Sequence, residues 1–252
     1  MRFASLGSGS RGNATLIEAG STRVLVDCGF SVKEVERRLK RFGLSPSDLQ
    51  AVLVTHEHAD HIRGVGALAR KYGLPVWASS GTLQFDGLGD LPRRKILNVH
   101  TSQALEELSI EPFPVPHDAK EPCQFVFSDG KAKVGLLTDT GSITRHIIEQ
   151  LDACHALMLE CNHDVEMLAE GPYPPALKRR VGGDFGHLSN VQAADVLDKM
   201  DKSRLQRVIA MHISEKNNDT ALATRILSEA LNCDDDDILV AEQDNGFDWI
   251  TV

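Results

Sequence analysis

The sequence of 252 residues contains few cysteines, no long apolar run and no excess of positive charge. Its five cysteines are scattered and form no Cys-X-X-Cys pair, which is typical of free thiols in a reducing compartment. No apolar stretch approaches the roughly 20 residues that a membrane-spanning helix needs, and the first residues carry no apolar core of a signal peptide. We therefore expect a cytoplasmic protein. Four cysteines in or beside apolar runs are predicted to be small buried residues: Cys28, Cys123, Cys154 and Cys161.

Acidic residues outnumber basic ones by 36 to 27, giving a formal net charge of −9. This balance argues against a general basic nucleic-acid binder. It does not exclude a nuclease, because a site for divalent cations must be rich in acids and the cations themselves attract phosphate. The local basic groups Arg93–Lys95 and Lys178–Arg180 are interpreted as solvated surfaces rather than binding patches.

The stretch Thr55-His56-Glu57-His58-Ala59-Asp60-His61 follows an apolar run, 51–54, that predicts a buried strand. A helical pattern begins at His61 and continues to Ala69. Side chains two apart on extended backbone face the same way, so His56 and His58 can share one metal ion. After the chain turns, Asp60 and His61 can reach a second ion. Two ions about 3.5–4 Å apart clamp the attacking and leaving oxygens of a hydrolysis.

This stretch resembles the His-X-His-X-Asp-His signature of the metallo-β-lactamase superfamily. The resemblance implies an α/β fold, the αββα sandwich, with two mixed sheets face to face, helices on the outer faces and metals at one edge. Three further residues match the superfamily pattern, each at the end of an apolar run: His117, Asp139 and His212. Asp27, which ends an earlier apolar strand, matches the superfamily's first motif, where it supports the ligands from behind.

On this resemblance one ion is assigned to His56, His58 and His117. The other ion is assigned to Asp60, His61 and His212. Asp139 is expected to bridge them, because a carboxylate has two oxygens. An Asp at this position suits oxygen-loving ions, so Zn²⁺ and Mn²⁺ both stay open. A water activated by these metals is expected to be the nucleophile.

The segment 159–190 is unlike that of a generic hydrolase. A helix is predicted to begin at Ser189 or Asn190, and its first backbone N–H groups would form an anion site beside His187. His187 is placed to protonate a leaving oxygen or hold a phosphate, although a simple loop residue is the alternative. His163 either contacts phosphate or is structural, and Glu160 at a strand end can orient a histidine. Residues 7–13 are a Gly/Ser-rich turn that either cradles an anion or is a plain hairpin loop.

The combination of SLGSGSRGN, VDCG, THEHADH, ECNHD..ML, YP..LK.R and GHLSN resembles the YycJ/WalJ-type family over nearly the whole chain. The resemblance implies a 5′→3′ exonuclease that acts on DNA rather than RNA and serves mismatch repair. Its catalytic residues would be Asp60 and His187, with substrate contacts from His163, His187, Ser189 and Asn190. The interval between Asp139 and His187 is too short for the inserted β-CASP domain of related nucleases, so we expect one domain over 1–252. The end of the chain, 187–197 and 211–214, is also similar to tRNA 3′-processing endonucleases.

Two other classes of function stay open. A small-molecule metallo-hydrolase of the same fold would act on a thioester, a lactone or a small phosphodiester, and a closed pocket rather than a groove would favour it. A non-catalytic regulatory or binding module is the third class. Several elements are also predicted from pattern alone: a helix over 32–42 capped by Gly43, a helix from about 220 to 231, and strands over 238–241 and 247–252.

Overall fold

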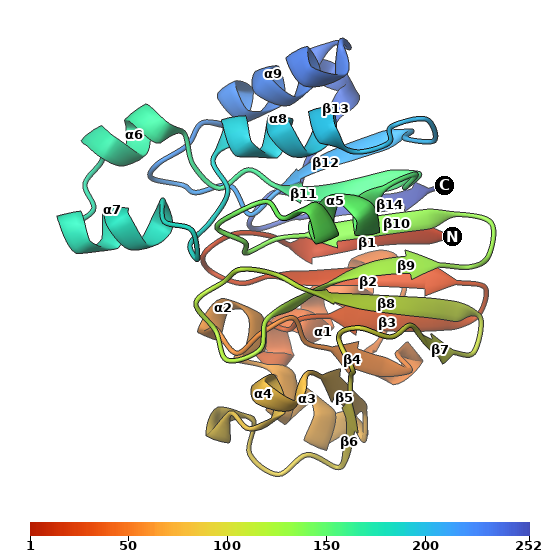
Figure 1. Ribbon diagram of the computed structural model, residues 1–252. Coiled ribbons are helices and arrows are strands. Elements are labelled where there is room, and N and C mark those ends of the chain that lie inside the picture. The colour runs from red at the N-terminus through yellow and green to blue at the C-terminus, as the bar shows by residue number, and fades with distance from the viewer.

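Two seven-stranded sheets pack face to face in the computed structural model, which describes residues 1–252, and helices cover both outer faces (Figure 1). The predicted αββα sandwich is therefore confirmed. The first sheet has the order β14-β1-β2-β3-β4-β5-β6, and the second has the order β13-β12-β11-β10-β9-β8-β7. Both sheets are mixed, because β3 to β6 and β10 to β13 pair in parallel whereas the remaining neighbours are antiparallel.

The strands of the first sheet are β1 (Arg2–Gly7), β2 (Ala14–Ala19), β3 (Thr22–Val26), β4 (Ala51–Leu53), β5 (Pro75–Ala78), β6 (Arg93–Ile96) and β14 (Phe247–Thr251). Those of the second are β7 (Gln103–Leu105), β8 (Leu108–Pro114), β9 (Cys123–Ser128), β10 (Lys133–Leu137), β11 (Ala156–Glu160), β12 (Arg207–Met211) and β13 (Ile238–Val240). The helices are α1 (Val32–Leu39), α2 (Ala59–Ile62), α3 (Val65–Tyr72), α4 (Ser80–Leu83), α5 (Arg145–Leu151), α6 (Val165–Glu170), α7 (Pro175–Val181), α8 (Asn190–Lys199) and α9 (Thr220–Leu231).

Three apolar clusters hold the layers together. The middle cluster lies between the sheets and contains Phe3, Phe125 and Phe127. The outer clusters join the first sheet to α1 and α3, and the second sheet to α5, α8 and α9. The sequence of strand β4 is apolar throughout because both faces of the strand are buried. Leu53 packs in the middle cluster, whereas Val52 packs in the outer cluster of the first sheet. A strand buried on both faces is a continuous apolar run rather than an alternating one.

Several expected boundaries shift. The helix expected from His61 to Ala69 is divided into α2 and α3, because the N–H of Gly64 donates to the carbonyl of Cys28 and the carbonyl of Asp60 accepts from the N–H of Asn13. The helix expected over 32–42 ends as α1 at Leu39 and continues as a 3₁₀ turn before the left-handed Gly43. The elements expected near 220–231, 238–241 and 247–252 are confirmed as α9, β13 and β14.

The basic group Arg93–Lys95, interpreted as a solvated surface, belongs to the edge strand β6, where Lys95 Nζ lies 3.5 Å from the ring centre of Trp77. The four cysteines predicted to be buried are buried. Crossing a membrane would require a longer and more apolar helix than any that the fold contains. Between Asp139 and His187 the chain forms α5, β11, α6 and α7.

One edge of the sandwich gathers the strand ends that carry polar residues. Asp27 follows β3, Asp139 follows β10 and His212 follows β12. All three have left-handed backbone, with φ of 61°, 49° and 52°. This conformation costs non-glycine residues free energy, and it recurs at functional sites. Figure 1 shows α6 and α7 beyond this edge, on the side away from the two chain termini. The fold therefore gathers a cluster of polar side chains at this edge of the sandwich.

Candidate metal centre

The turn after β4 brings the histidines of the motif together. His56 lies at the strand end, His58 is the N-cap residue of α2, and His61 lies within α2. Ligating atoms of His56, His58 and His117 all lie within 4.8 Å of one another. His117 Nε2 is 3.2 Å from His58 Nδ1. The first predicted ligand group is therefore assembled from two segments, the turn after β4 and the turn after β8.

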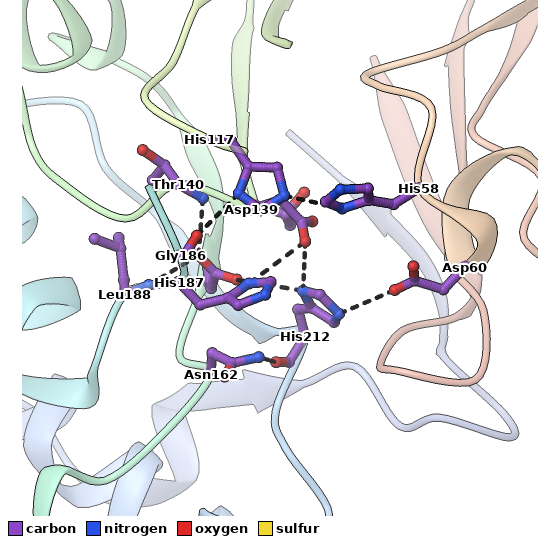
Figure 2. Close-up of polar contacts among 12 residues, drawn as sticks. His58, Asp60, His117, Asp139, Thr140, Asn162, Gly186, His187, Leu188 and His212 are labelled. Carbon is purple, nitrogen blue, oxygen red and sulfur yellow. Dashed lines mark hydrogen bonds and ion pairs between the residues drawn. The ribbon is translucent and has the colours of Figure 1, made fainter. Parts of the chain in front are cut away.

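A second group forms beside the first. Ligating atoms of Asp60, His61 and His212 again lie within 4.8 Å of one another. Asp60 Oδ2 is 3.6 Å from His61 Nε2 and 3.5 Å from His212 Nε2. Figure 2 shows Asp60 and His212 approaching from different parts of the chain. This set matches the second predicted ligand group.

Asp139 lies between the two groups. Its Oδ2 is 3.2 Å from His61 Nε2, and its Oδ1 is 3.2 Å from His212 Nδ1. It also forms a candidate ligand set with His56 and His61. A carboxylate in this position can offer one oxygen to each of two ions, as expected for a bridging residue.

Hydrogen bonds fix which ring nitrogen of three histidines faces the centre. His61 Nδ1 donates to Asp27 Oδ2 at 2.8 Å, and Asp27 is itself held by the backbone N–H and hydroxyl of Thr55. His56 Nδ1 donates to Thr55 Oγ1 at 2.9 Å, and His117 Nδ1 donates to the carbonyl of Gly186 at 2.9 Å. In each case Nε2 remains available as a metal ligand. Asp27 therefore occupies the supporting position expected from the sequence.

Burial and neighbouring carboxylates shift the pKa values of His56 and His61 in opposite directions. Burial and the charge of His61 lower the pKa of His56 well below its usual value. Burial also lowers the pKa of His61, but Asp139, Asp60 and Asp27 outweigh it and raise that pKa well above its usual value. The buried carboxylates around His61 require a positive charge beside them, and here a proton on His61 supplies it. A metal ion supplies this charge and displaces the proton.

Glu160, at the end of β11, supports His187 and His212 at the same time. Its Oε1 lies 2.8 Å from His187 Nδ1 and 3.2 Å from His212 Nδ1. Its Oε2 accepts hydrogen bonds from the backbone N–H groups of Thr140 and Leu188. Burial raises the pKa of Glu160, but the charge of His187 and the hydrogen bonds from both histidines outweigh it and lower the pKa to about 2.

A half-open cavity of about 400 Å³ gives access to the centre. Its lining combines candidate ligands with residues of α7 and of the Gly/Ser-rich turn: Ser10, His58, Ala59, Asp60, Asp118, Asp139, Asn162, Tyr173, Leu177, Arg180, Val181, Gly186, His187, His212 and Ser214. His187 therefore lies where the sequence predicted, beside the centre and open to the cavity.

Three predicted substrate contacts do not line this cavity. His163 and Ser189 line a separate hollow beside α6 and α7, and His163 Nδ1 is buried without a hydrogen-bond partner. Ser189 is the N-cap of α8 and accepts from the backbone N–H of Gln192. The side chain of Asn190 is paired with that of Asn218.

The structure offers little to the anion predicted at the start of α8. Several N–H groups at and just before this helix start already have acceptors inside the protein. The N–H of Leu188 donates to Glu160, and the N–H of Ser189 donates to the side chain of Gln192. The N–H of Asn190 donates to the carbonyl of His163. A capping box of this kind satisfies the helix end and leaves little for an anion.

Several residues at the centre were missed by the sequence analysis. Ser8 Oγ accepts from the backbone N–H of His212 at 2.9 Å. Asn13 Nδ2 lies 3.1 Å from His61 Nε2. The turn 7–13 therefore holds the ligand segments in place. The only sequence signal was its wealth of Gly and Ser, which left its role open. Asp118 follows His117 directly, and Arg180 belongs to a basic group that was assigned to the surface.

The residues present fit two divalent cations. His56 Nε2 and Asp139 Oδ2 are buried without a hydrogen-bond partner, although the latter lies 3.2 Å from His61 Nε2. A buried polar atom without a partner costs free energy unless something else satisfies it. Imidazole nitrogens with carboxylate oxygens are ligands typical of zinc, and they also suit manganese.

Comparison with known proteins gives the family. The Beta-lactamase superfamily domain matches residues 22–213 of this chain. The chain is 37% identical over 235 residues to Exodeoxyribonuclease YycJ of Bacillus anthracis, covering 92% of this chain and 89% of the relative. It is 36% identical over 228 residues to Exodeoxyribonuclease WalJ of Streptococcus pneumoniae, covering 88% and 85% of the two chains.

A solved structure agrees on the fold. The metallo-beta-lactamase fold protein YhfI from Bacillus subtilis has a TM-score of 0.75 at 17% identity, covering 99% of this chain and 98% of that one. The sequence motifs, the sandwich and the histidine-carboxylate cluster agree with these matches. The chain therefore belongs to the beta-lactamase superfamily and, within it, to the family of the YycJ and WalJ relatives.

Proposed function

We propose that this protein is a metal-dependent nuclease that degrades DNA from the 5′ end, with two Zn²⁺ or Mn²⁺ ions. One observation carries the proposal: two adjoining sets of metal-ligand atoms, each within 4.8 Å, open into one cavity. The relatives with 37% and 36% identity, both named exodeoxyribonucleases, support DNA as the substrate. The proposal includes a single domain over residues 1–252, a cytoplasmic location and, from the family resemblance, a role in DNA repair.

The proposed ligands divide between two ions. His56, His58 and His117 would hold one ion. Asp60, His61 and His212 would hold the other, and Asp139 would contribute to both. When bound, the ions would supply Lewis-acid activation of water and neutralise negative charge on the scissile phosphate.

His187 is proposed to donate a proton to the leaving group. Glu160 accepts from its Nδ1, so Nε2 is the nitrogen left for the substrate. In the 5′→3′ direction, water adds to phosphorus and the bond from phosphorus to the 3′ oxygen breaks. His187 Nε2 donates a proton to that oxygen as it leaves.

Asp60 is proposed to serve catalysis as well as ligation. Its side chain is 23% exposed, whereas the side chains of His61 and Asp139 are 1% and 2% exposed. It also lines the cavity. Its carboxylate can orient the attacking water and receive the proton of that water.

The test is degradation of 5′-phosphorylated single- and double-stranded DNA, labelled at either end, with Mn²⁺ or Zn²⁺. We expect metal-dependent loss of nucleotides from the 5′ end. Asp139→Ala should abolish this activity and His187→Ala should weaken it. The matched controls are Asp198→Ala, whose side chain is 61% exposed, and His146→Ala on the exposed face of α5, and both should keep wild-type activity.

The same assay also shows when the nuclease proposal or its direction of cleavage is wrong. If the metal-loaded protein leaves DNA and RNA intact, the nuclease proposal is wrong. A small-molecule hydrolase of thioesters, lactones or small phosphodiesters would then take its place. Degradation that starts only at the 3′ end would keep the nuclease and overturn its direction.

A further inference from the structure

The hollow lined by His163 and Ser189 has no role in the mechanism above. It is open to solvent, has a volume of about 590 Å³ and is lined by residues of α6, α7 and the first turn of α8. Figure 1 shows α6 and α7 projecting from the sandwich, and no residue of α7 is buried. This space is here called the helix hollow. Its lining combines apolar and basic side chains and contains no Asp or Glu.

Two exposed valines form the apolar part of the lining. Val165, the first residue of α6, is 55% exposed, and Val191 in the first turn of α8 is 56% exposed. The N–H of Asn190 donates to the carbonyl of His163, so the two helices start from adjoining backbone. Leu168 also lines the hollow but is only 6% exposed, and it therefore forms part of the floor. Single exposed apolar residues are ordinary, whereas several that line one hollow mark an interaction site.

Lys178 and Arg179 bring positive charge to the helix hollow. Lys178 Nζ donates to the carbonyl of Ala169 at 2.6 Å, which ties α7 to α6. Arg180 is paired with Asp118, whereas neither Lys178 nor Arg179 has a carboxylate partner in the protein. In a chain whose net charge is −9, these two cations make the hollow locally positive. Its charge therefore complements carboxylates.

Helix α7 separates the helix hollow from the cavity at the metal centre. Leu177, Arg180 and Val181 line the cavity, whereas Lys178 and Arg179 line the hollow. The hollow and the cavity share no lining residue. A ligand in the hollow therefore leaves access to the candidate metal ligands open, and the hollow is distinct from the proposed substrate site.

We propose that the helix hollow docks a short segment of a partner protein that carries both carboxylates and large apolar side chains. The carboxylates pair with Lys178 and Arg179, and an apolar side chain packs against Val165, Val191 and Leu168. A polypeptide fits better than a nucleic-acid strand, because a strand offers phosphates to the cations but no aliphatic side chain to the valines. This inference goes beyond the proposed nuclease function and does not depend on it.

The test begins with an unbiased probe, a phage-displayed library of random short peptides that is selected on the intact wild-type protein. We expect the recovered peptides to be rich in Asp and Glu and to contain at least one Leu, Ile, Phe or Trp. Fluorescence polarisation with synthetic copies of these peptides measures their affinity. Added salt should weaken their binding, because the carboxylates meet solvent-accessible cations.

Matched variants locate the binding site. Val191→Glu and Arg179→Glu should each weaken peptide binding by roughly tenfold or more, because each sets a carboxylate against those of the peptide. Glutamate suits the first turn of a helix, so Val191→Glu should keep the fold of α8. The controls are Ile96→Glu, which replaces a 64% exposed apolar side chain on β6, and Arg204→Glu at another exposed arginine. Both controls should bind the peptides as the wild type does.

Several results would overturn the inference. One is the recovery of no peptide whose binding depends on both Val191 and Arg179, and another is the recovery of peptides without acidic residues. Slower DNA cleavage by Arg179→Glu than by Arg204→Glu would assign the cation to the substrate instead. Self-association of the wild type that Val191→Glu abolishes, measured by light scattering, would replace the partner with a second copy of this chain. If the wild type binds the peptides as expected but cleaves no DNA, the docking site stands and the nuclease proposal fails.

Discussion

Glu160 Oε1 lies 2.8 Å from His187 Nδ1, and the same oxygen lies 3.2 Å from His212 Nδ1. One buried carboxylate thus orients the proposed proton donor and a proposed metal ligand. Its second oxygen is held by two backbone amides, those of Thr140 and Leu188. The position of Glu160 is therefore fixed by contacts within the protein, which is the arrangement expected of an outer partner of a metal site.

Replacing Glu160 with Gln should lower kcat on DNA roughly 10–100-fold, because outer partners of metal sites are worth about that much. The amide cannot accept from both histidines while also accepting from both backbone amides. Steady-state kinetics on single-stranded DNA measure the effect, and metal content shows how much arises through His212. A variant with normal kcat would mean that His187 does not depend on Glu160 for its orientation.

Asp27→Asn should weaken metal affinity roughly 10–100-fold, because Asp27 orients His61 without lying among the proposed ligands. Its carboxylate accepts from His61 Nδ1 at 2.8 Å and also from Thr55. Competition with a chelator of known affinity measures the change. Asp48→Asn, a partly exposed carboxylate in the 3₁₀ turn Pro46–Asp48, is the control. Unchanged affinity would remove Asp27 from the supporting network.

Gly29→Ala should destabilise the fold and disturb Asp60 together. A Cβ at this position would collide with the carbonyl oxygen of Asp60 and crowd the backbone nitrogen of Asn13. Overpacking of this kind costs about 1–3 kcal/mol in free energy of unfolding. Gly43→Ala is the control, because a Cβ there meets nothing within 4 Å and pays only for its left-handed backbone. Denaturant unfolding and metal titration of both variants test this, and equal losses would contradict it.

His163 should make stability depend on pH. Burial lowers its pKa to about 4 in the folded protein, below the usual value of 6.5. The unfolded chain therefore binds the proton first, and the free energy of unfolding falls as pH decreases from about 6.5 to 4. The full effect is about 3 kcal/mol, at 1.36 kcal/mol per pKa unit.

The measurement is the difference in unfolding free energy between the wild type and His163→Gln across this pH range. Other titrating groups are the same in both proteins and cancel in the difference. The wild type should lose more stability toward pH 4 than the variant. A difference that does not change with pH would show that His163 is not held neutral by burial.

The residue types and spacing of the motif led directly to the candidate metal centre. His56, His58, Asp60 and His61 lie within one short turn, and their ligand character is visible in a single segment. His117, Asp139 and His212 were recognisable because each follows an apolar strand. Strands β8, β10 and β12 run in the same direction, so their ends lie at a common edge. The local sequence pattern, through its resemblance to the superfamily signature, thus predicted both the fold class and the candidate ligands.

Contacts between distant segments were not predictable. The hydrogen bond from His212 to Ser8 spans 204 residues, and the ion pair of Arg180 with Asp118 spans 62. No local pattern distinguishes Arg180 from Arg179, although only Arg180 lines the cavity. The amides around the start of α8 illustrate the same point, because the N–H of Leu188 donates to Glu160 on β11 and the N–H of Asn190 donates to the carbonyl of His163.

The most direct test of this account is the number of metal ions bound per chain, measured by elemental analysis together with DNA cleavage. Two ions per chain are predicted for wild-type protein equilibrated with Zn²⁺ or Mn²⁺. Asp139→Ala should bind fewer than two and lose cleavage, whereas Asp198→Ala should bind two and cleave normally. Wild-type protein that cleaves DNA with no bound metal, or that binds two ions equally well without Asp139, would contradict the account.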